Sequence, residues 1–341
     1  MRHVNPRLAV NLTTDRLAAL PLAIVYVTDR CNSKCVTCDF WRYGQTNLPV
    51  ERARQLAKEF RRMGTQVVLL TGGEALLHPR WHDVASSFRA QGQRLWLLTA
   101  GLSLKKHAAR AAELCEKITV SLDGATPETY QAIRGVAAFE AVCAGIRAAV
   151  ERGAWVSLRC TVQRGNYREM PALVRLAREL GVKQVSFLAV DVSTHVAFAR
   201  REDYERTMAL SPDDLPAFAA VLDSLDRDFA ADFASGFIAE RPEKLRRLHQ
   251  YFAALLGEAS FPSVRCNAPR FSAVVGADGA LQPCYFIPGV NRLNGHSLSA
   301  ALNAPEFVAL REDIREGKRA ECGKCVCSMW RGARELLAGS F

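Results

Sequence analysis

The chain has 341 residues, a formal net charge of +10 and 49% hydrophobic residues. This composition excludes global disorder and leaves room for one large domain and a smaller one. The positive charge would suit nucleic acid or an anionic surface. However, the Arg and Lys residues are scattered, with no arginine-rich tract and no aromatic RNA-binding strand, so we expect no nucleic-acid partner.

The most apolar stretch near the N-terminus is 17–27. It is too short to span a bilayer and no small-residue cleavage site follows it, so we interpret it as leading into a buried strand. We therefore expect no signal peptide, no membrane helix and a cytoplasmic location. The eleven cysteines are odd in number and unevenly clustered. That pattern fits metal binding or catalysis in a reducing compartment better than a disulfide framework.

Apolar runs rich in strand-forming residues alternate with segments of helical periodicity. Runs that are apolar on both faces predict parallel strands covered by helices. The predicted strands are 22–28, 66–71, 94–99, 117–122, 155–162 and 184–190. The predicted helices include 51–63, 137–152 and 167–180, closed by Gly64, Gly153 and Gly181, and 212–226, which opens with Ser211 as N-cap and Pro212 at its first position.

The six βα units predict an α/β fold, as either a doubly wound sheet or a curved, incomplete barrel. In both cases the functional loops follow the C-terminal ends of the strands. We predict an N-terminal extension over 1–20, the βα core over 21–190, a helical bridge over 191–260 and a small α+β cysteine-rich domain over 261–341.

The first βα connection, from 29 to about 49, is long and holds Cys31, Cys35 and Cys38. Short spacings of this kind let one loop wrap an iron–sulfur cluster. Three thiolates leave one iron of a 4Fe–4S cube free to bind a cofactor or substrate, whereas a structural zinc site prefers four ligands.

Three further strand ends carry matching motifs. Gly72-Gly73-Glu74 closes the second strand, Thr99-Ala100-Gly101 the third, and Ser121-Leu122-Asp123-Gly124 the fourth. Together with the cysteine loop, they resemble the radical S-adenosylmethionine (radical SAM) superfamily over roughly 20–190. The resemblance implies a partial (βα)6 TIM-like barrel.

The resemblance also implies cofactors and roles. Cys31, Cys35 and Cys38 would hold a 4Fe–4S cluster that binds S-adenosylmethionine (SAM). Gly72, Gly73, Glu74, Thr99, Ser121, Asp123 and Arg159 would line the cofactor site. Glu74 with the Gly73 carbonyl suits the ammonium group of SAM, and Ser121 with Arg159 suits its carboxylate. Asp123 could hold a ribose hydroxyl or only shape its turn.

Two positions depart from the family pattern. Thr37 stands where relatives commonly have an aromatic or other bulky residue, and Ala75 where Pro is common. The first departure puts the expected packing around adenine in doubt, and Phe40 or Trp41 could substitute. Neither departure removes a ligand.

A second cysteine group near the C-terminus consists of Cys266, Cys284, Cys322, Cys325 and Cys327. Between its first two members, an Asp278-Gly279 turn predicts a β-hairpin. The arrangement resembles the auxiliary-cluster extensions of the superfamily, called SPASM with two clusters and twitch with one. The cysteine count favours one auxiliary 4Fe–4S cluster. Its ligands would be the first four of these cysteines, or Cys327 would replace Cys325. The alternative is a structural zinc site with four thiolate ligands. Cys115, Cys143 and Cys160 are expected to be inert core residues.

The resemblance implies an enzyme, an oxidoreductase or maturase. It would reductively cleave SAM to a 5′-deoxyadenosyl radical that abstracts hydrogen from a small metabolite or peptide, with an electron donor such as flavodoxin or ferredoxin. Only about twenty residues precede the first strand, too few for a leader-peptide-binding domain, which favours a small molecule or a peptide delivered by another protein. Asp191 and Tyr285 could be acid–base or relay residues, but a capping Asp and a packed aromatic explain them better. The alternatives are a non-catalytic iron–sulfur electron-transfer protein and a zinc-stabilised binding protein.

Overall fold

The computed structural model describes residues 6–194, 197–200, 208–293 and 295–337. A single sheet forms its centre, with the strand order β6-β5-β4-β3-β2-β1-β7-β8-β9. The strands are β1 (Leu22–Thr28), β2 (Val67–Gly72), β3 (Arg94–Thr99), β4 (Lys117–Ser121), β5 (Val156–Val162), β6 (Gln184–Ala189), β7 (Ser272–Val275), β8 (Ala280–Gln282) and β9 (Asn291–Arg292).

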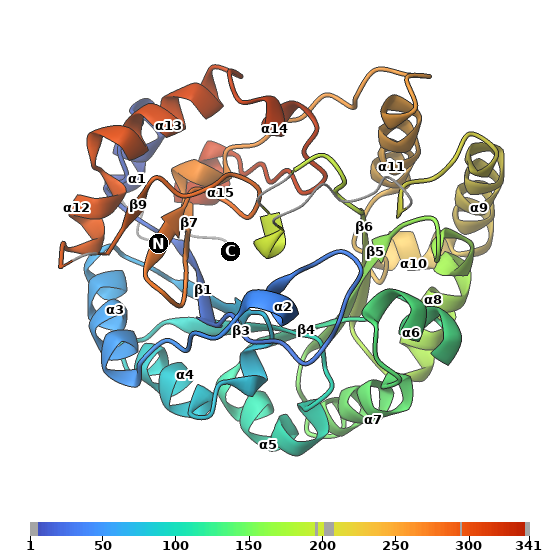
Figure 1. Cartoon of the computed structure of the whole chain (residues 1–341), viewed down its shortest axis with the longest axis horizontal. Coiled ribbons are helices and arrows are strands. Elements are labelled where there is room, and N and C mark those ends of the chain that lie inside the picture. Colours follow the sequence, from blue (N-terminus) through green and yellow to red (C-terminus); the bar gives the residue numbers. More distant parts are fainter. Residues whose placement is uncertain (1–5, 195–196, 201–207, 294, 338–341) are drawn as a thin grey trace.

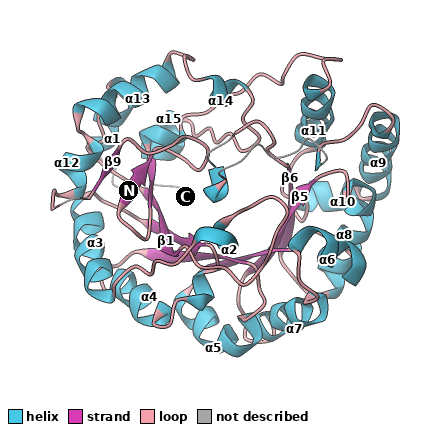
Figure 2. Cartoon of the chain, viewed as in Figure 1, coloured by secondary structure: helices cyan, strands magenta, loops and turns pink. Residues whose placement is uncertain are grey.

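The first six strands are parallel and sequential, each paired with the next. Every residue of β1 is buried, as expected for a central strand covered on both faces. All six predicted strands are confirmed to within one or two residues at their ends. The fold is therefore α/β with an open, curved sheet, as a partial barrel requires, and Figure 2 shows that sheet inside a shell of helices.

Helices cover the outside of the curve, from α3 through α8, as Figure 1 shows. The α-helices are α1 (Arg7–Thr13), α2 (Phe40–Tyr43), α3 (Val50–Arg62), α4 (Trp81–Arg89), α5 (Leu104–Leu114), α6 (Pro127–Arg134), α7 (Phe139–Val150), α8 (Met170–Glu179), α9 (Asp214–Asp228), α10 (Ala230–Ser235), α11 (Pro242–Leu255), α12 (Leu298–Leu302), α13 (Pro305–Arg315), α14 (Ala320–Gly323) and α15 (Ala333–Leu337). Short 3₁₀ turns are η1 (Ala75–Leu77), η2 (Tyr167–Glu169), η3 (Ala197–Ala199) and η5 (Ala268–Arg270).

The predicted helix ends are confirmed at three positions. Gly64, Gly153 and Gly181 follow α3, α7 and α8 and adopt φ values of 70°, 76° and 71°, the left-handed conformation of a C-terminal helix cap. The predicted start of α9 is wrong by two residues. Ser211 donates its hydroxyl to Asp214 (2.6 Å) instead of accepting from the helix, so the regular turns begin at Asp214.

The C-terminal segment extends the same sheet. β7 pairs in parallel with β1, from Leu22 opposite Ser272 to Val25 opposite Val275, and β8 and β9 follow antiparallel. The hairpin predicted at Asp278-Gly279 is therefore present, and Gly279 has the positive φ (83°) that its turn needs. The domain boundary predicted at residue 261 does not coincide with any break in the sheet.

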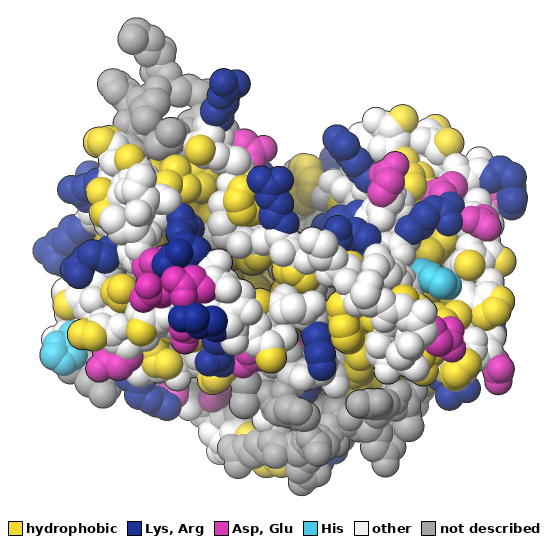
Figure 3. Space-filling view, turned by 90° about the horizontal axis from the view of Figure 1, so that it is seen from above, with side chains coloured by type: hydrophobic (Ala, Val, Ile, Leu, Met, Phe, Trp, Pro, Cys, Tyr) yellow, Lys and Arg dark blue, Asp and Glu magenta, His cyan; other side chains and the backbone are white. Residues whose placement is uncertain are grey.

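The extension before β1 also packs onto the C-terminal segment. The buried Asn11 side chain of α1 donates to the carbonyls of Ala19 (2.7 Å) and Arg270 (2.8 Å). Among the described residues, no helix combines the length and the apolar character needed to cross a membrane. On the face seen in Figure 3, Lys and Arg side chains are interspersed with Asp and Glu.

Candidate cofactor site at the strand ends

The cysteine loop leaves β1 and docks against the end of α6. The backbone N–H of Lys34 donates to the Arg134 carbonyl (2.9 Å), and that of Val36 donates to Ile133 (3.0 Å). These carbonyls belong to the last turn of α6 and have no partner within the helix. Gly135, at φ 69°, makes this contact possible because a Cβ there would lie 2.2 Å from the Lys34 carbonyl oxygen.

The three cysteines of this loop lie together as free thiols. The pKa of Cys31 is raised to about 12, mainly by burial, and the nearby Cys35 contributes to the rise. Burial likewise raises the pKa of Cys38 to about 12, with Cys35 and Cys31 adding to the effect. A buried thiol is therefore protonated at neutral pH until a metal displaces the proton.

Polar atoms around these thiols show that the loop fits a cluster. Asn32 Oδ1 and Ser33 Oγ are buried, and neither meets a partner with hydrogen-bond geometry among the described residues. Ser33 Oγ lies close enough to Cys35 to lower the pKa of that thiol. Such an unsatisfied group costs about 1–3 kcal/mol, so a group that could pair with it is expected beside Cys31 and Cys35. In the part of the chain the structure describes, no three His, Cys, Asp or Glu side chains surround one metal-ion position. Cluster ligands need no such point, because each thiolate binds a different iron.

Gly72 and Gly73 hold β2 against the start of the cysteine loop. A Cβ on Gly72, whose φ is 151°, would lie 1.9 Å from the Thr28 carbonyl oxygen, and one on Gly73 would lie 2.4 Å from that of Arg30. The N–H of Gly73 donates to Thr28 (2.9 Å) and that of Glu74 to Arg30 (2.8 Å). The close packing of the chain's own loop therefore requires glycine at both positions, and their contact with SAM stays a prediction.

Glu74 is 1% exposed and is held by three donors. Its Oε1 accepts from the Thr99 hydroxyl (2.7 Å) and the Leu76 N–H (3.0 Å), and its Oε2 from the Ala100 N–H (2.5 Å). Burial raises the pKa of Glu74, and these hydrogen bonds oppose that rise. Glu74 also lies close enough to Cys31 to raise the pKa of that thiol. The structure thus brings Glu74, Thr99 and the cysteine loop together, and Thr99 acts on Glu74.

Asp123 is buried and already has two partners at its carboxylate. Its Oδ1 accepts from the Thr161 N–H (2.7 Å) and its Oδ2 from Arg134 (3.0 Å), while its backbone carbonyl accepts from Asn166 (2.9 Å). These contacts shape the turn after β4. Contact with a ribose hydroxyl stays a prediction.

Ser121 and Arg159 are register neighbours on β4 and β5, and Ser186 of β6 is the next residue across. Arg159 donates to the Ser186 hydroxyl (3.3 Å), and its side chain is exposed on an otherwise mostly buried strand. Its charge also lowers the pKa of Glu240 and of Tyr285, both of which burial raises. The predicted pair therefore shares one sheet face, and its contact with a carboxylate stays a prediction.

The five C-terminal cysteines also come together. Burial raises the pKa of Cys284 to about 11, and Cys266 and Cys327 raise it further. Burial raises the pKa of Cys322 to about 11, with Cys284 and Cys266 adding to the effect. Burial also raises the pKa of Cys325, next to Cys327.

Asn267 connects the segment that holds Cys266 to the segment that follows Cys327 by three hydrogen bonds. Its N–H donates to Met329 (2.9 Å), its side-chain amide donates to the Arg331 carbonyl (2.8 Å), and its Oδ1 accepts from the Arg331 N–H (2.9 Å). The segments that hold Cys266 and Cys327 are thereby held side by side.

Aromatic side chains fill the space between the two cysteine groups. The ring centroid of Tyr26 lies 5.5 Å from that of Phe40 and 6.4 Å from that of Tyr285. Burial raises the pKa of Tyr26, and Tyr285, Cys38 and Cys284 raise it further, so Tyr26 lies between one thiol of each group. Of the two roles considered for Tyr285, relay residue or packed aromatic, the ring contact with Tyr26 favours the packed aromatic.

Asp191 is engaged as a capping and pairing residue. It accepts from the Ser193 N–H (3.0 Å) and forms a buried ion pair with Arg200 (3.4 Å). Arg200 in turn donates to the Thr37 carbonyl in the cysteine loop (3.1 Å). Asp191 therefore supports the cysteine loop through Arg200.

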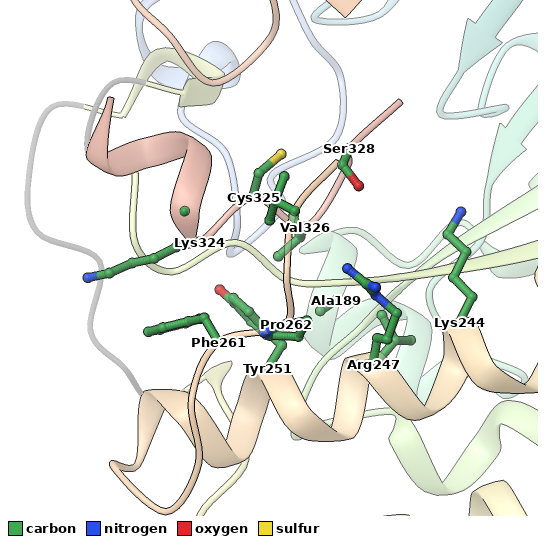
Figure 4. Close-up of a pocket in the computed structure, with 13 residues that line it drawn as sticks. Ala189, Lys244, Arg247, Tyr251, Phe261, Pro262, Lys324, Cys325, Val326 and Ser328 are labelled. Atoms are coloured by element: carbon green, nitrogen blue, oxygen red, sulfur yellow. The ribbon is translucent and has the colours of Figure 1, made fainter. Parts of the chain in front are cut away.

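Cavities elsewhere are not the cofactor site. Figure 4 shows one of about 50 Å³ between α11, which carries Lys244 and Arg247, and the loop that carries Cys325. It is far below the roughly 300–1,000 Å³ typical of small-molecule sites. A larger cavity of about 390 Å³, between α3 and α4, is lined by none of the predicted site residues.

Sequence reasoning missed two residues of the site, Tyr130 and Arg134 on α6. Arg134 pairs with Asp123 and influences the thiols of Cys35 and Cys31. The only signal in the sequence is an Arg-Gly pair eleven residues after Asp123, which looks like an ordinary helix end.

Comparison with known families completes this description. Residues 25–177 match the family model described as the radical SAM superfamily. The likeness to this superfamily thus covers one domain, which is less than half of the chain. Relatives of this domain are enzymes.

The chain is 31% identical over 193 residues to the pre-heme d1 synthase of Dinoroseobacter shibae, covering 54% of this chain and 46% of that protein. It is 33% identical over 169 residues to the GTP 3′,8-cyclase of Erythrobacter litoralis, covering 46% and 50%.

Similarity to the Fe-coproporphyrin III synthase of Methanosarcina barkeri is 29% identity over 191 residues, covering 53% of this chain and 45% of that protein. The chain spans about half the length of these curated relatives. The superfamily implies a 4Fe–4S cluster and SAM.

Solved structures share the fold beyond that domain. Streptococcus suis SuiB bound to S-adenosylmethionine superimposes with a TM-score of 0.67 at 14% identity, covering 95% of this chain and 76% of that chain. Native anSMEcpe with bound AdoMet and the Cp18Cys peptide gives 0.65 at 18% identity, covering 91% and 89%. At these identities the likeness shows the fold alone, an α/β partial barrel.

Proposed function

We propose that this protein is a radical SAM enzyme that reductively cleaves SAM and abstracts hydrogen from a substrate. The observation that carries the proposal is the meeting of the Cys31, Cys35 and Cys38 loop with the buried Glu74 carboxylate at one edge of the sheet. When bound, the 4Fe–4S cluster supplies the electron that breaks SAM into methionine and a 5′-deoxyadenosyl radical.

The chain's own residues bind and orient SAM. Glu74, fixed by its three donors, receives the ammonium group, and the Gly73 carbonyl accepts a second hydrogen bond. Ser121 and Arg159 bind the carboxylate, and Asp123 accepts from a ribose hydroxyl with a lone pair left free by Thr161 and Arg134. Burial of this edge keeps water away from a reactive intermediate.

The C-terminal cysteines hold a second, auxiliary 4Fe–4S cluster in a twitch-like arrangement over 261–341. Four thiolates, from Cys266, Cys284, Cys322 and either Cys325 or Cys327, would complete its coordination. The shared neighbourhood of all five thiols supports this proposal. Four thiolates also suit zinc, and the iron count below separates the two.

The substrate proposed first is a small metabolite that undergoes oxidation. The relatives at about 30% identity carry the names of tetrapyrrole synthases and a GTP cyclase. A peptide is the second candidate, because the SuiB fold neighbour has been solved with its precursor peptide. A flavodoxin- or ferredoxin-type protein would supply the electron.

Anaerobic reconstitution tests the proposal. Two clusters predict about eight iron atoms per chain and formation of 5′-deoxyadenosine from SAM under strong reductant. Cys35→Ala is expected to retain about half the iron and to abolish cleavage, whereas Cys115→Ala, a core thiol outside both groups, should change neither. Zinc without iron, or full iron without any cleavage, would contradict the proposal.

A further inference from the structure

The inner face of α6 presents two buried donors that have no acceptor. The Tyr130 hydroxyl and Arg134 Nε are both buried, and neither meets an acceptor among the residues the structure describes. The Arg134 guanidinium lies close enough to the Tyr130 hydroxyl to lower the pKa of that phenol. Tyr130 is 0% exposed and the Arg134 side chain 11%. The two residues are four apart in the helix, so they lie on one face and point the same way.

That face lies against the cysteine loop. The Lys34 and Val36 N–H groups, on either side of Cys35, are bonded to the last two residues of α6. Cys35 lies close enough to both donors to affect the pKa of Tyr130 and of Arg134. The two orphan donors therefore meet the loop at its middle thiol, beside the unsatisfied Asn32 and Ser33 atoms.

The position of α6 is fixed at both ends. At its N-terminal end Glu169 accepts from the Ala125 N–H (2.6 Å) and the Thr129 hydroxyl (2.5 Å), and at its C-terminal end Gly135 closes on Lys34. Donors on a helix held in this way stay aimed without reorganising when charge appears nearby.

The charge of Arg134 is only partly neutralised. Its one described ion-pair partner is Asp123, whose other carboxylate oxygen is bonded to Thr161. A buried guanidinium stays charged and has five N–H donors, of which Asp123 takes one at 3.0 Å. The neighbouring cations Arg30 and Lys34 are exposed, so water and salt screen them, whereas Arg134 acts through protein.

We infer that Arg134 and Tyr130 form the outer hydrogen-bonding shell of the first cluster and raise its reduction potential. Reduction moves one electron from a low-potential protein donor, which is oxidised, onto the cluster, whose net charge becomes more negative by one. A fixed cation and aimed N–H and O–H donors favour that more negative state. Arg134 and Tyr130 are thus positioning residues that make the cluster easier to reduce. The inference rests on the proposed cluster at Cys31, Cys35 and Cys38.

The test is a redox titration of reconstituted protein, monitored by electron paramagnetic resonance. The first cluster is identified as the signal that changes when SAM is added, and the titration itself is run without SAM. Arg134→Gln is expected to make reduction at least tenfold less favourable, which is about 59 mV more negative for a one-electron couple. Tyr130→Phe should shift the midpoint potential in the same direction by a smaller amount. Arg134→Lys, which keeps the positive charge, should shift the midpoint by less than half as much as Arg134→Gln.

Two controls make the comparison specific. Arg147→Gln removes an exposed cation from α7 and should leave the midpoint unchanged. The signal that SAM does not affect should keep its midpoint in every variant.

Midpoints of Arg134→Gln and Tyr130→Phe equal to that of the unaltered protein, at full iron content, would overturn the inference. If Arg134→Gln cannot hold iron, an unchanged midpoint in Tyr130→Phe at full iron content would overturn it. Failure of the proposed function looks different: an unaltered protein that binds and reduces the cluster but never cleaves SAM.

Discussion

Thr99 should control how well the protein binds SAM, although nothing in the proposed site requires it to touch SAM. Its hydroxyl donates to Glu74 Oε1 at 2.7 Å and accepts from the Gly101 N–H at 2.9 Å. Replacing Thr99 by Val keeps the shape of the side chain and removes both bonds. Glu74 then keeps only the Leu76 and Ala100 donors.

The magnitude follows from the bond that is lost. A hydrogen bond to a charged group contributes about 1.5–3 kcal/mol. Without it the Glu74 carboxylate is less firmly oriented, and its pKa, already raised by burial, rises further. If the low end of that contribution is lost from binding, about 1.4 kcal/mol, the dissociation constant for SAM increases about tenfold.

Anaerobic calorimetry with SAM on reconstituted protein measures this directly. Thr99→Ser keeps the hydroxyl and should bind SAM within about twofold of the unaltered protein, a difference of about 0.4 kcal/mol. Thr119→Val is the matched control on β4, since its hydroxyl pairs with Ser157 (3.0 Å) and not with Glu74. Equal affinity of Thr99→Val and the unaltered protein, at equal iron content, would refute the reasoning.

Two further predictions concern stability. Gly135→Ala should lower the stability of the protein and its iron content, because a Cβ there would meet the Lys34 carbonyl oxygen at 2.2 Å. Gly153→Ala is the control, since Gly153 also has a positive φ but has open space around it. That control should cost only about 1–2 kcal/mol of backbone strain and leave the iron content unchanged. Asp214 gives a pH dependence: burial raises its pKa, but bonds from the Ser211 hydroxyl and N–H outweigh burial and hold the pKa at about 2, below the ordinary 3.8. A carboxyl whose pKa is lowered in the folded state stabilises the protein above its unfolded-state pKa and loses that effect as the pH falls. Asp214→Asn should therefore destabilise the apoprotein at neutral pH. The difference in denaturation midpoint between this variant and the unaltered protein should vanish between about pH 4 and pH 2.

The six barrel strands could be predicted because burial on both faces leaves continuous apolar runs. Every residue of β1, for example, is apolar or small enough to be buried. The partner of β7 could not be predicted in the same way. The short run Ser-Ala-Val-Val at 272–275 indicates a buried strand but not which strand lies beside it. Only the packed structure pairs them with β1.

The cysteines and Glu74 could be predicted because their residue types at fixed spacings after strands are chemically specific. Arg134 could not, since a basic residue in the last turn of a helix is common wherever the helix dipole favours it. Its importance comes from burial and from the unsatisfied Nε, and neither is visible in a linear sequence. The Thr99–Glu74 bond is similar, because it joins the ends of two different strands.

The pairing of β7 with β1 has a consequence for the order of events during synthesis. Leu22 and Ser272 are 250 residues apart along the chain, so the edge of β1 stays without its neighbour until the β7 segment has left the ribosome. An exposed apolar edge of this kind invites pairing with other chains. We therefore expect the nascent barrel to depend on chaperones, and insertion of iron to follow the docking of β7, because the strand that carries the first cysteine loop is enclosed only then.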